Sequence, residues 1–187
     1  MRCVAFLVIA VVLGACARDP YVTNSGEIEA GSWRIARQID RVIASQLPSA
    51  TVISWGSNTY VPGVKYATLQ LTCHDGQPLV RFGFDFKIGS DRNTFFGYRF
   101  DDKPGRDGIE SRVLRGYQVI VIEEQAAVAQ FLTDLKGSRR LYMRLRSLTG
   151  GRTSAEFPVD GSDAAVQAAF TECSGSVPRA PASASIY

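Results

Sequence analysis

Regular alternation of apolar and polar residues dominates the middle of the chain and predicts β-strands there. In Lys65 to Cys73, Ala, two Leu and Cys alternate with Thr and Gln, and in Pro78 to Lys87 one Val and three Phe share a side. Because successive side chains of a strand point to opposite faces, each run has one buried and one solvated face. Asp75-Gly76 between them is typical of a tight hairpin turn. Thr94 to Asp101 repeats the alternation, so the three runs predict an antiparallel meander.

Shorter alternating runs predict further strands, and two of them form a second hairpin. These runs are Trp33 to Ile39, Thr51 to Trp55, Glu110 to Leu114, Tyr117 to Glu123, Arg139 to Ser147 and Thr153 to Val159. The last two flank Gly150-Gly151, a pair that supplies turn chemistry. No periodicity between Val42 and Pro48 separates strand from helix. Asp101 to Gly108 contains Pro and Gly and predicts a loop.

Two segments carry apolar residues at helical spacing. Glu124 to Leu135 places them at i, i+3, i+4 and i+7 behind acidic residues, which a helix N-terminus favours. Ser162 is a candidate N-cap for a second helix that runs through Glu172, and its apolar stripe ends at Cys173. The patterns together predict an α+β fold: a mainly antiparallel, sandwich-like β-sheet with two amphipathic helices.

The first 16 residues have the layout of an export signal followed by a cysteine. Arg2 precedes the apolar run Val4 to Val12, and small residues lead into Cys16. The run is shorter than the roughly 17 to 25 residues that a membrane-spanning helix needs. The segment resembles the lipobox of bacterial lipoproteins, which implies acylation of Cys16 and cleavage before it. A plain secretory signal that leaves Cys16 as a free thiol is the alternative.

Lipidation of Cys16 implies a location and a division of the chain. Two or three acyl chains anchor a protein stably in a membrane. Ala17 stands where inner-membrane lipoproteins carry Asp, so the resemblance favours a periplasm-facing site on the outer membrane over the inner membrane. We expect a signal peptide over residues 1–15, a lipidated tether over 16–31, a single β-rich domain over 32–173 and a disordered tail over 174–187.

The remaining cysteines predict a crosslink. The chain has four Cys; Cys3 leaves with the signal and Cys16 carries lipid, so Cys73 and Cys173 remain. Exported thiols that can meet usually pair, which predicts a Cys73–Cys173 disulfide. Two buried, unpaired thiols are the alternative, because a cysteine count does not establish proximity.

Charge and motifs offer little support for catalysis. Removal of residues 1–15, which hold Arg2 and no acid, leaves 20 Lys+Arg against 18 Asp+Glu, a formal charge of +2. With no basic stripe, nucleic acid is not an expected partner. The sole histidine, His74, has no zinc-type spacing around it and is interpreted as a turn residue, so neither metal nor cofactor is expected. Asp101-Asp102 is interpreted as strand-end chemistry and Glu123-Glu124 as charge at a helix start.

Five polar side chains form a candidate interaction face. Alternation places Arg81, Arg99, Tyr142, Arg144 and Arg146 on the solvated side of their strands. Arg and Tyr are enriched at binding hot spots. The alternative is an ordinary solvated sheet face whose Arg side chains pair with Asp85 and Asp101 across strands.

Part of the chain resembles a group of small exported bacterial proteins. The resemblance covers Leu71 to Pro104, which includes a Tyr-Arg-Phe-Asp strand end, and Leu141 to Cys173, which includes a Gly-x-Thr-x-x-x-Phe strand and a Cys-terminated helix. Similar patterns occur in uncharacterised lipoproteins and in periplasmic accessory proteins of type VI secretion. The resemblance implies the β-rich fold and the disulfide, and the stretch from Trp33 to Trp55 departs from it.

These observations predict a lipid-anchored, noncatalytic envelope module. It is expected to bind another protein or an envelope polymer in the periplasm and to contact the membrane through acyl chains on Cys16. One alternative is an envelope hydrolase that uses Asp101, Asp102 or His74. Another is a structural lipoprotein without a specific ligand.

Overall fold

The nine alternating runs and two further segments form eleven strands, and the two helical patterns form two helices, in the computed structural model, which describes residues 22–40, 42, 46–90, 94–114, 116–171 and 173. In chain order the elements are β1 (Val22–Ala30), β2 (Trp33–Asp40), β3 (Gln46–Asn58), β4 (Val61–His74), β5 (Gln77–Phe84), β6 (Thr94–Phe100), β7 (Arg106–Ile109), β8 (Arg112–Leu114), β9 (Val119–Ile122), α1 (Gln125–Leu135), β10 (Arg140–Ser147), β11 (Gly151–Pro158) and α2 (Ser162–Phe170). The predicted signal peptide, Cys16 and the predicted C-terminal tail lie outside the described residues.

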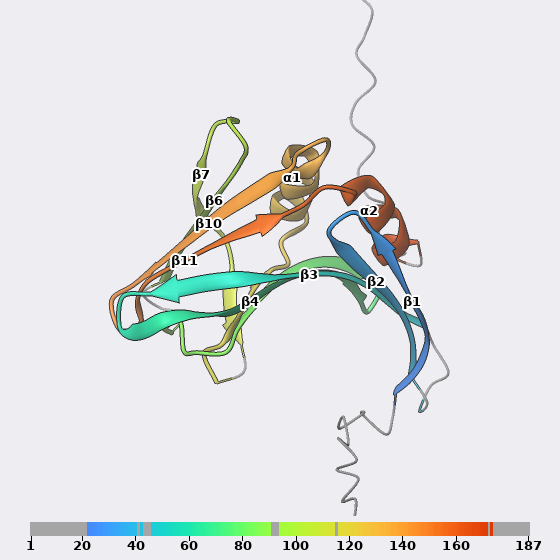
Figure 1. Cartoon of the computed structure of the whole chain (residues 1–187), viewed down its shortest axis with the longest axis horizontal. Coiled ribbons are helices and arrows are strands. Elements are labelled where there is room, and N and C mark those ends of the chain that lie inside the picture. Colours follow the sequence, from blue (N-terminus) through green and yellow to red (C-terminus); the bar gives the residue numbers. More distant parts are fainter. Residues whose placement is uncertain are drawn as a thin grey trace, which may run out of the picture.

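One curled antiparallel sheet contains all eleven strands. Its main order is β7-β6-β10-β11-β3-β4-β5-β9-β8, and β2 joins it through β3 with β1 outside β2. Figure 1 shows the curl, with both helices on the same side of β3 and β4. The predicted α+β, mainly antiparallel fold with two helices is confirmed. The layers of the sandwich-like arrangement come from the curling of a single sheet.

Phenylalanines hold the inner face of the curl together. Phe82 of β5 lies 5.2 Å from Phe96 of β6 and 5.9 Å from Phe157 of β11, measured between ring centroids. Phe131 of α1 closes the cluster at 6.1 Å from Phe82. All four rings are fully buried, so the alternating Phe positions of the sequence form the core. The opposite face of the sheet, called the outer face below, turns away from this core.

The helices begin differently from each other. Glu124 caps α1, because its carboxylate accepts the backbone N–H groups of Ala126 and Ala127, as its place at a helix start predicted. At α2 the prediction was wrong: Gly161 holds the N-cap position in a left-handed conformation (φ +83°), and Ser162 is buried as the first helical residue. The turn at Gly161 lies against the Ala30 carbonyl of the β1–β2 turn, where a Cβ would not fit, so this position needs glycine rather than a residue with a capping side chain.

Two predicted connections were wrong. β6 pairs with β10 and β7 rather than with β5, whose free edge is taken by β9, so the three runs do not form a meander. Alternation identifies the buried face of a strand but carries no information about its neighbours.

The tether predicted over residues 16–31 is contradicted at Val22–Ala30, because β1 pairs along β2 in an antiparallel register. The β-sheet therefore starts before residue 32.

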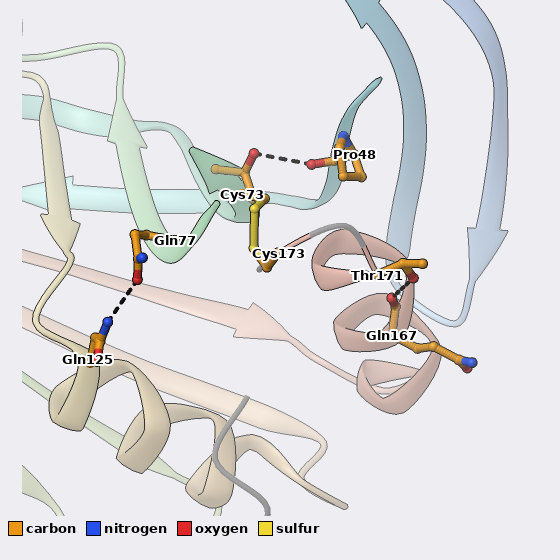
Figure 2. Close-up of a disulfide and its surroundings, with 8 residues drawn as sticks. Pro48, Cys73, Gln77, Gln125, Gln167, Thr171 and Cys173 are labelled. Carbon is orange, nitrogen blue, oxygen red and sulfur yellow. Dashed lines mark hydrogen bonds between the residues drawn. A yellow bond between two sulfur atoms is a disulfide. The ribbon is translucent and has the colours of Figure 1, made fainter. Parts of the chain in front are cut away.

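The predicted disulfide joins the end of β4 to Cys173, which lies just after the end of α2. Cys73 and Cys173 are bonded, with their Cα atoms 5.7 Å apart. Figure 2 shows a second tie nearby, in which the Gln125 amide at the start of α1 donates to the Gln77 side chain at the start of β5, at 2.8 Å. The β4–β5 hairpin turn thus holds one end of each helix.

Candidate functional site

The candidate interaction face divides into two places. Arg99 of β6 lies opposite Tyr142 of β10 in the register, and Arg144 and Arg146 follow on β10, all on the outer face. Arg81 stands on β5, and β4, β3 and β11 separate its strand from β10. The sequence therefore identified one cluster of four residues and one residue that belongs elsewhere.

The four clustered residues are held by neighbours on the same face. The guanidinium groups of Arg144 and Arg146 donate to one oxygen of Asp107 at 3.0 and 2.8 Å. Arg99 lies over the ring of Tyr142, with its guanidinium carbon 5.2 Å from the ring centroid. The predicted acidic partners Asp85 and Asp101 were wrong for Arg144 and Arg146. Their partner comes from β7, a strand for which the sequence indicated a loop.

Arg81 lines a separate groove on the outer face. The groove has a volume of about 690 Å³ and extends over β4, β5, β8 and β9. His74 and the ion pair between Arg112 and Glu123, at 2.7 Å, lie along it. The His74 side chain is 75% exposed and lies 3.6 Å from the Asp75 carboxylate, and His74 is the last residue of β4, directly before the hairpin turn.

A row of charged and aromatic side chains crosses the outer face. In the register, Arg99 lies opposite Tyr142, Tyr142 opposite Glu156, Glu156 opposite Trp55, and Trp55 opposite Tyr66. We call these five residues the outer row. With adjacent strands about 4.8 Å apart, it spans roughly 19 Å. Trp55 and Tyr66 are 54% and 57% exposed, so the row presents large rings to solvent.

A cleft opens beside the outer row where two strands leave β3. β2 pairs with β3 up to Thr51, and β11 pairs with β3 from Trp55 onward. The cleft has a volume of about 710 Å³. We call it the fork cleft, and it is lined by Ser54, Trp55, Arg139, Arg140, Glu156, Pro158 and Asp160. Its lining comes from β3, from the start of β10, from the end of β11 and from the segment after β11.

Polar contacts fix the walls of the fork cleft. Arg140 and Glu156 form an ion pair, and the hydrogen bond and charge of Glu156 raise the pKa of the Arg140 guanidinium above its usual value. The Asp160 carboxylate accepts the Ser32 hydroxyl at 2.6 Å, and the Asp160 carbonyl accepts the Ser32 backbone N–H at 3.1 Å. A Cβ on Gly161 would lie 2.3 Å from the Ala30 carbonyl oxygen. The β1–β2 turn therefore packs directly on the segment that carries Asp160.

The residues considered for hydrolysis do not form one site. The Asp101 carboxylate accepts the backbone N–H groups of Arg139 at 3.0 Å and Arg140 at 2.9 Å, which ties the end of β6 to the start of β10. His74 ends β4, and β10, β11 and β3 lie between β4 and β6. Asp101 thus performs the strand-end role expected from the sequence.

Sequence reasoning did not identify Trp55, Tyr66 and Glu156 as site residues. Trp55 stood at the end of a short predicted strand, and Tyr66 lies on the side of β4 where the polar residues alternate. That exposed position was a usable signal, because a large ring among the solvated positions of a strand is informative. The neighbours of these rings depend on the strand order, which the sequence did not reveal.

Within the described ranges, neither helix has the length or the apolar run needed to cross a membrane. The same residues hold no group of three or more His, Cys, Asp or Glu side chains placed to bind a metal ion.

Comparison with known proteins identifies a relative by fold. No family model and no curated protein matches the sequence. The chain is similar to the crystal structure of invasion associated protein B from Bartonella henselae, with a TM-score of 0.50 and 13% identity over 79% of this chain and 97% of that one. An identity this low shows a shared fold alone.

Proposed function

We propose that this protein is a lipid-anchored, noncatalytic binding module of the bacterial envelope and that the outer face of its sheet is the contact surface. The observation that carries the proposal is the outer row, in which two exposed aromatic rings and their charged neighbours continue across five strands. Trp, Tyr and Arg are the residues that most often dominate binding energy. Burial of these rings against a partner removes apolar surface from water, which favours association.

The contacts around the row support a binding role over an ordinary solvated face. Arg99 is held over Tyr142, Arg146 lies 5.8 Å from the Phe95 ring centroid, and Trp55 stacks on Tyr66. Side chains that neighbours already restrain lose little further freedom when a partner binds. The outer face is thus preorganised for a contact along its length.

Site-specific photocrosslinking in cells tests the contact surface. A photoreactive residue at position 95 or 99, on the outer face, should give reproducible adducts in the envelope fraction. The matched control carries the same residue at the exposed position 163 on α2 and should give none. Adducts of equal yield from both places, or none from the outer face, would contradict the proposed contact surface.

The anchor is tested separately by the intact mass of protein extracted from membranes. We expect a chain that starts at Cys16 and carries acyl groups, and a Cys16→Ala variant that is released from the membrane. A chain that retains Met1 would contradict the proposed processing.

A further inference from the structure

The fork cleft has an apolar wall made by one indole ring. Trp55 stacks on Tyr66 with ring centroids 4.5 Å apart and an interplanar angle of 23°. Since Tyr66 comes from β4 and covers one face of the indole, the opposite face of Trp55 turns toward Glu156 of β11 and the cleft. The ring is 54% exposed, so this face is available to a ligand.

The polar rim of the fork cleft is balanced in charge. Arg139 and Arg140 contribute two positive charges, and Glu156 and Asp160 contribute two negative charges. A polyanion would meet both carboxylates, so the cleft favours a neutral ligand. A guanidinium has five N–H donors and a carboxylate has about four acceptor positions. The Arg140–Glu156 ion pair therefore retains donors and acceptors for a ligand that carries several hydroxyl groups.

We propose that the fork cleft binds a neutral pyranose unit of an envelope glycan, with the sugar ring against Trp55 and its hydroxyls bonded to Arg140, Glu156 and Asp160. A pyranose presents C–H bonds on its faces and hydroxyls around its edge. The electron-rich indole face attracts such C–H groups, and the rim satisfies the hydroxyls. A volume of about 710 Å³ suits a small-molecule subsite. This inference rests on the proposed function and names its ligand class.

Two other classes of ligand, polyanions and proteins, fit the fork cleft less well than a neutral sugar does. The cations of Arg144 and Arg146 are engaged by Asp107, so a polyanion would have to displace an internal partner. A protein partner typically covers about 800 Å² on each side, which requires much of the outer face rather than one cleft. Among the described residues, the fork cleft combines one exposed indole face with a rim of balanced charge.

Calorimetric titration of the full-length protein tests the inference. The protein is kept in a detergent without a sugar headgroup, because a glucoside would compete for the cleft. The probes are cellotetraose and N-acetylated chitotetraose, both neutral, with dextran sulfate as a polyanion. At least one tetrasaccharide should bind saturably, and Trp55→Ala and Glu156→Gln should each weaken binding at least about tenfold. Tyr60→Ala removes an exposed ring outside the cleft and should leave the affinity within about twofold.

The inference is overturned if neither tetrasaccharide binds, if Trp55→Ala binds as tightly as the wild type, or if dextran sulfate alone binds. Circular dichroism of each variant establishes that the fold is retained. Photocrosslinking from positions 95 and 99 distinguishes failure of the glycan proposal from failure of the proposed contact surface. Protein adducts from those positions without saccharide binding would reject the glycan ligand and retain the contact surface. Absence of both the adducts and the saccharide binding would reject the glycan ligand and the contact surface together.

Discussion

At the residue scale, Asp134 joins three elements through one carboxylate. It accepts hydrogen bonds from Arg106 of β7, from Gln130 on its own helix at 3.0 Å and from the Tyr98 hydroxyl of β6 at 3.3 Å. Burial raises the pKa of Asp134, but the hydrogen bond and charge of Arg106 outweigh it, so the pKa lies below the usual value. Burial and the negative charge of Asp134 raise the pKa of Tyr98. The carboxylate is therefore stabilised in its ionised form.

The Asp134→Asn variant should be less stable than the wild type by about 1 to 2 kcal/mol at neutral pH, a value reduced by the partial exposure of Arg106. Because the folded pKa of Asp134 is depressed, its contribution is complete above the unfolded pKa of about 3.9 and is lost as the pH falls through the folded pKa. Urea unfolding from pH 7 to pH 2.5 should show the difference between wild type and variant shrinking below about pH 4.

The matched control for Asp134 is Asp102→Asn, which changes an exposed carboxylate in the loop after β6. Its free energy of unfolding should stay within about 0.5 kcal/mol of the wild type. A difference for Asp134→Asn that grows toward acid pH would contradict the assignment.

At the element scale, periodicity predicted most strands and both helices, and turn residues predicted the β4–β5 and β10–β11 hairpins, but the predicted pairing of β6 with β5 was wrong. β4, β5 and β10 follow the alternation read from the chain, and α1 follows its apolar stripe. β6 pairs instead with β10, which places Phe100 opposite Leu141. Such a contact joins residues far apart in the sequence and leaves no local pattern.

Reduction of Cys73–Cys173 should destabilise the protein by roughly 2 to 5 kcal/mol. The disulfide spans 100 residues, and the loss of its constraint on the unfolded chain approaches the upper end of that range in the chain-entropy model. Denaturant unfolding with and without reductant measures the difference. The Cys73→Ala, Cys173→Ala double variant should match the reduced protein and show no response to reductant. Equal stability of the oxidised and reduced wild type would contradict a stabilising role.

At the scale of the whole molecule, the candidate site is a product of strand order. Alternation alone placed Arg99, Tyr142, Arg144 and Arg146 on one solvated side, which the structure confirms. It also added Arg81, which only the strand order removes from the group. The lining of the fork cleft depends on β11 pairing with both β10 and β3, an arrangement that no single segment of sequence encodes. The exposed side chains of each strand were thus predictable from the sequence, whereas their assembly into one site was not.

The most direct measurement of the outer face as the binding surface uses the two tryptophans of the chain. Trp33 is completely buried, while Trp55 stands exposed on the outer row. Full-length protein labelled with 5-fluorotryptophan should give two ¹⁹F resonances, assigned with a Trp55→Phe variant. On addition of an envelope extract from the producing cells, a contact at the outer face predicts that the Trp55 resonance shifts or broadens selectively while Trp33 serves as the internal reference. An unchanged Trp55 resonance in protein that the extract demonstrably binds would contradict it.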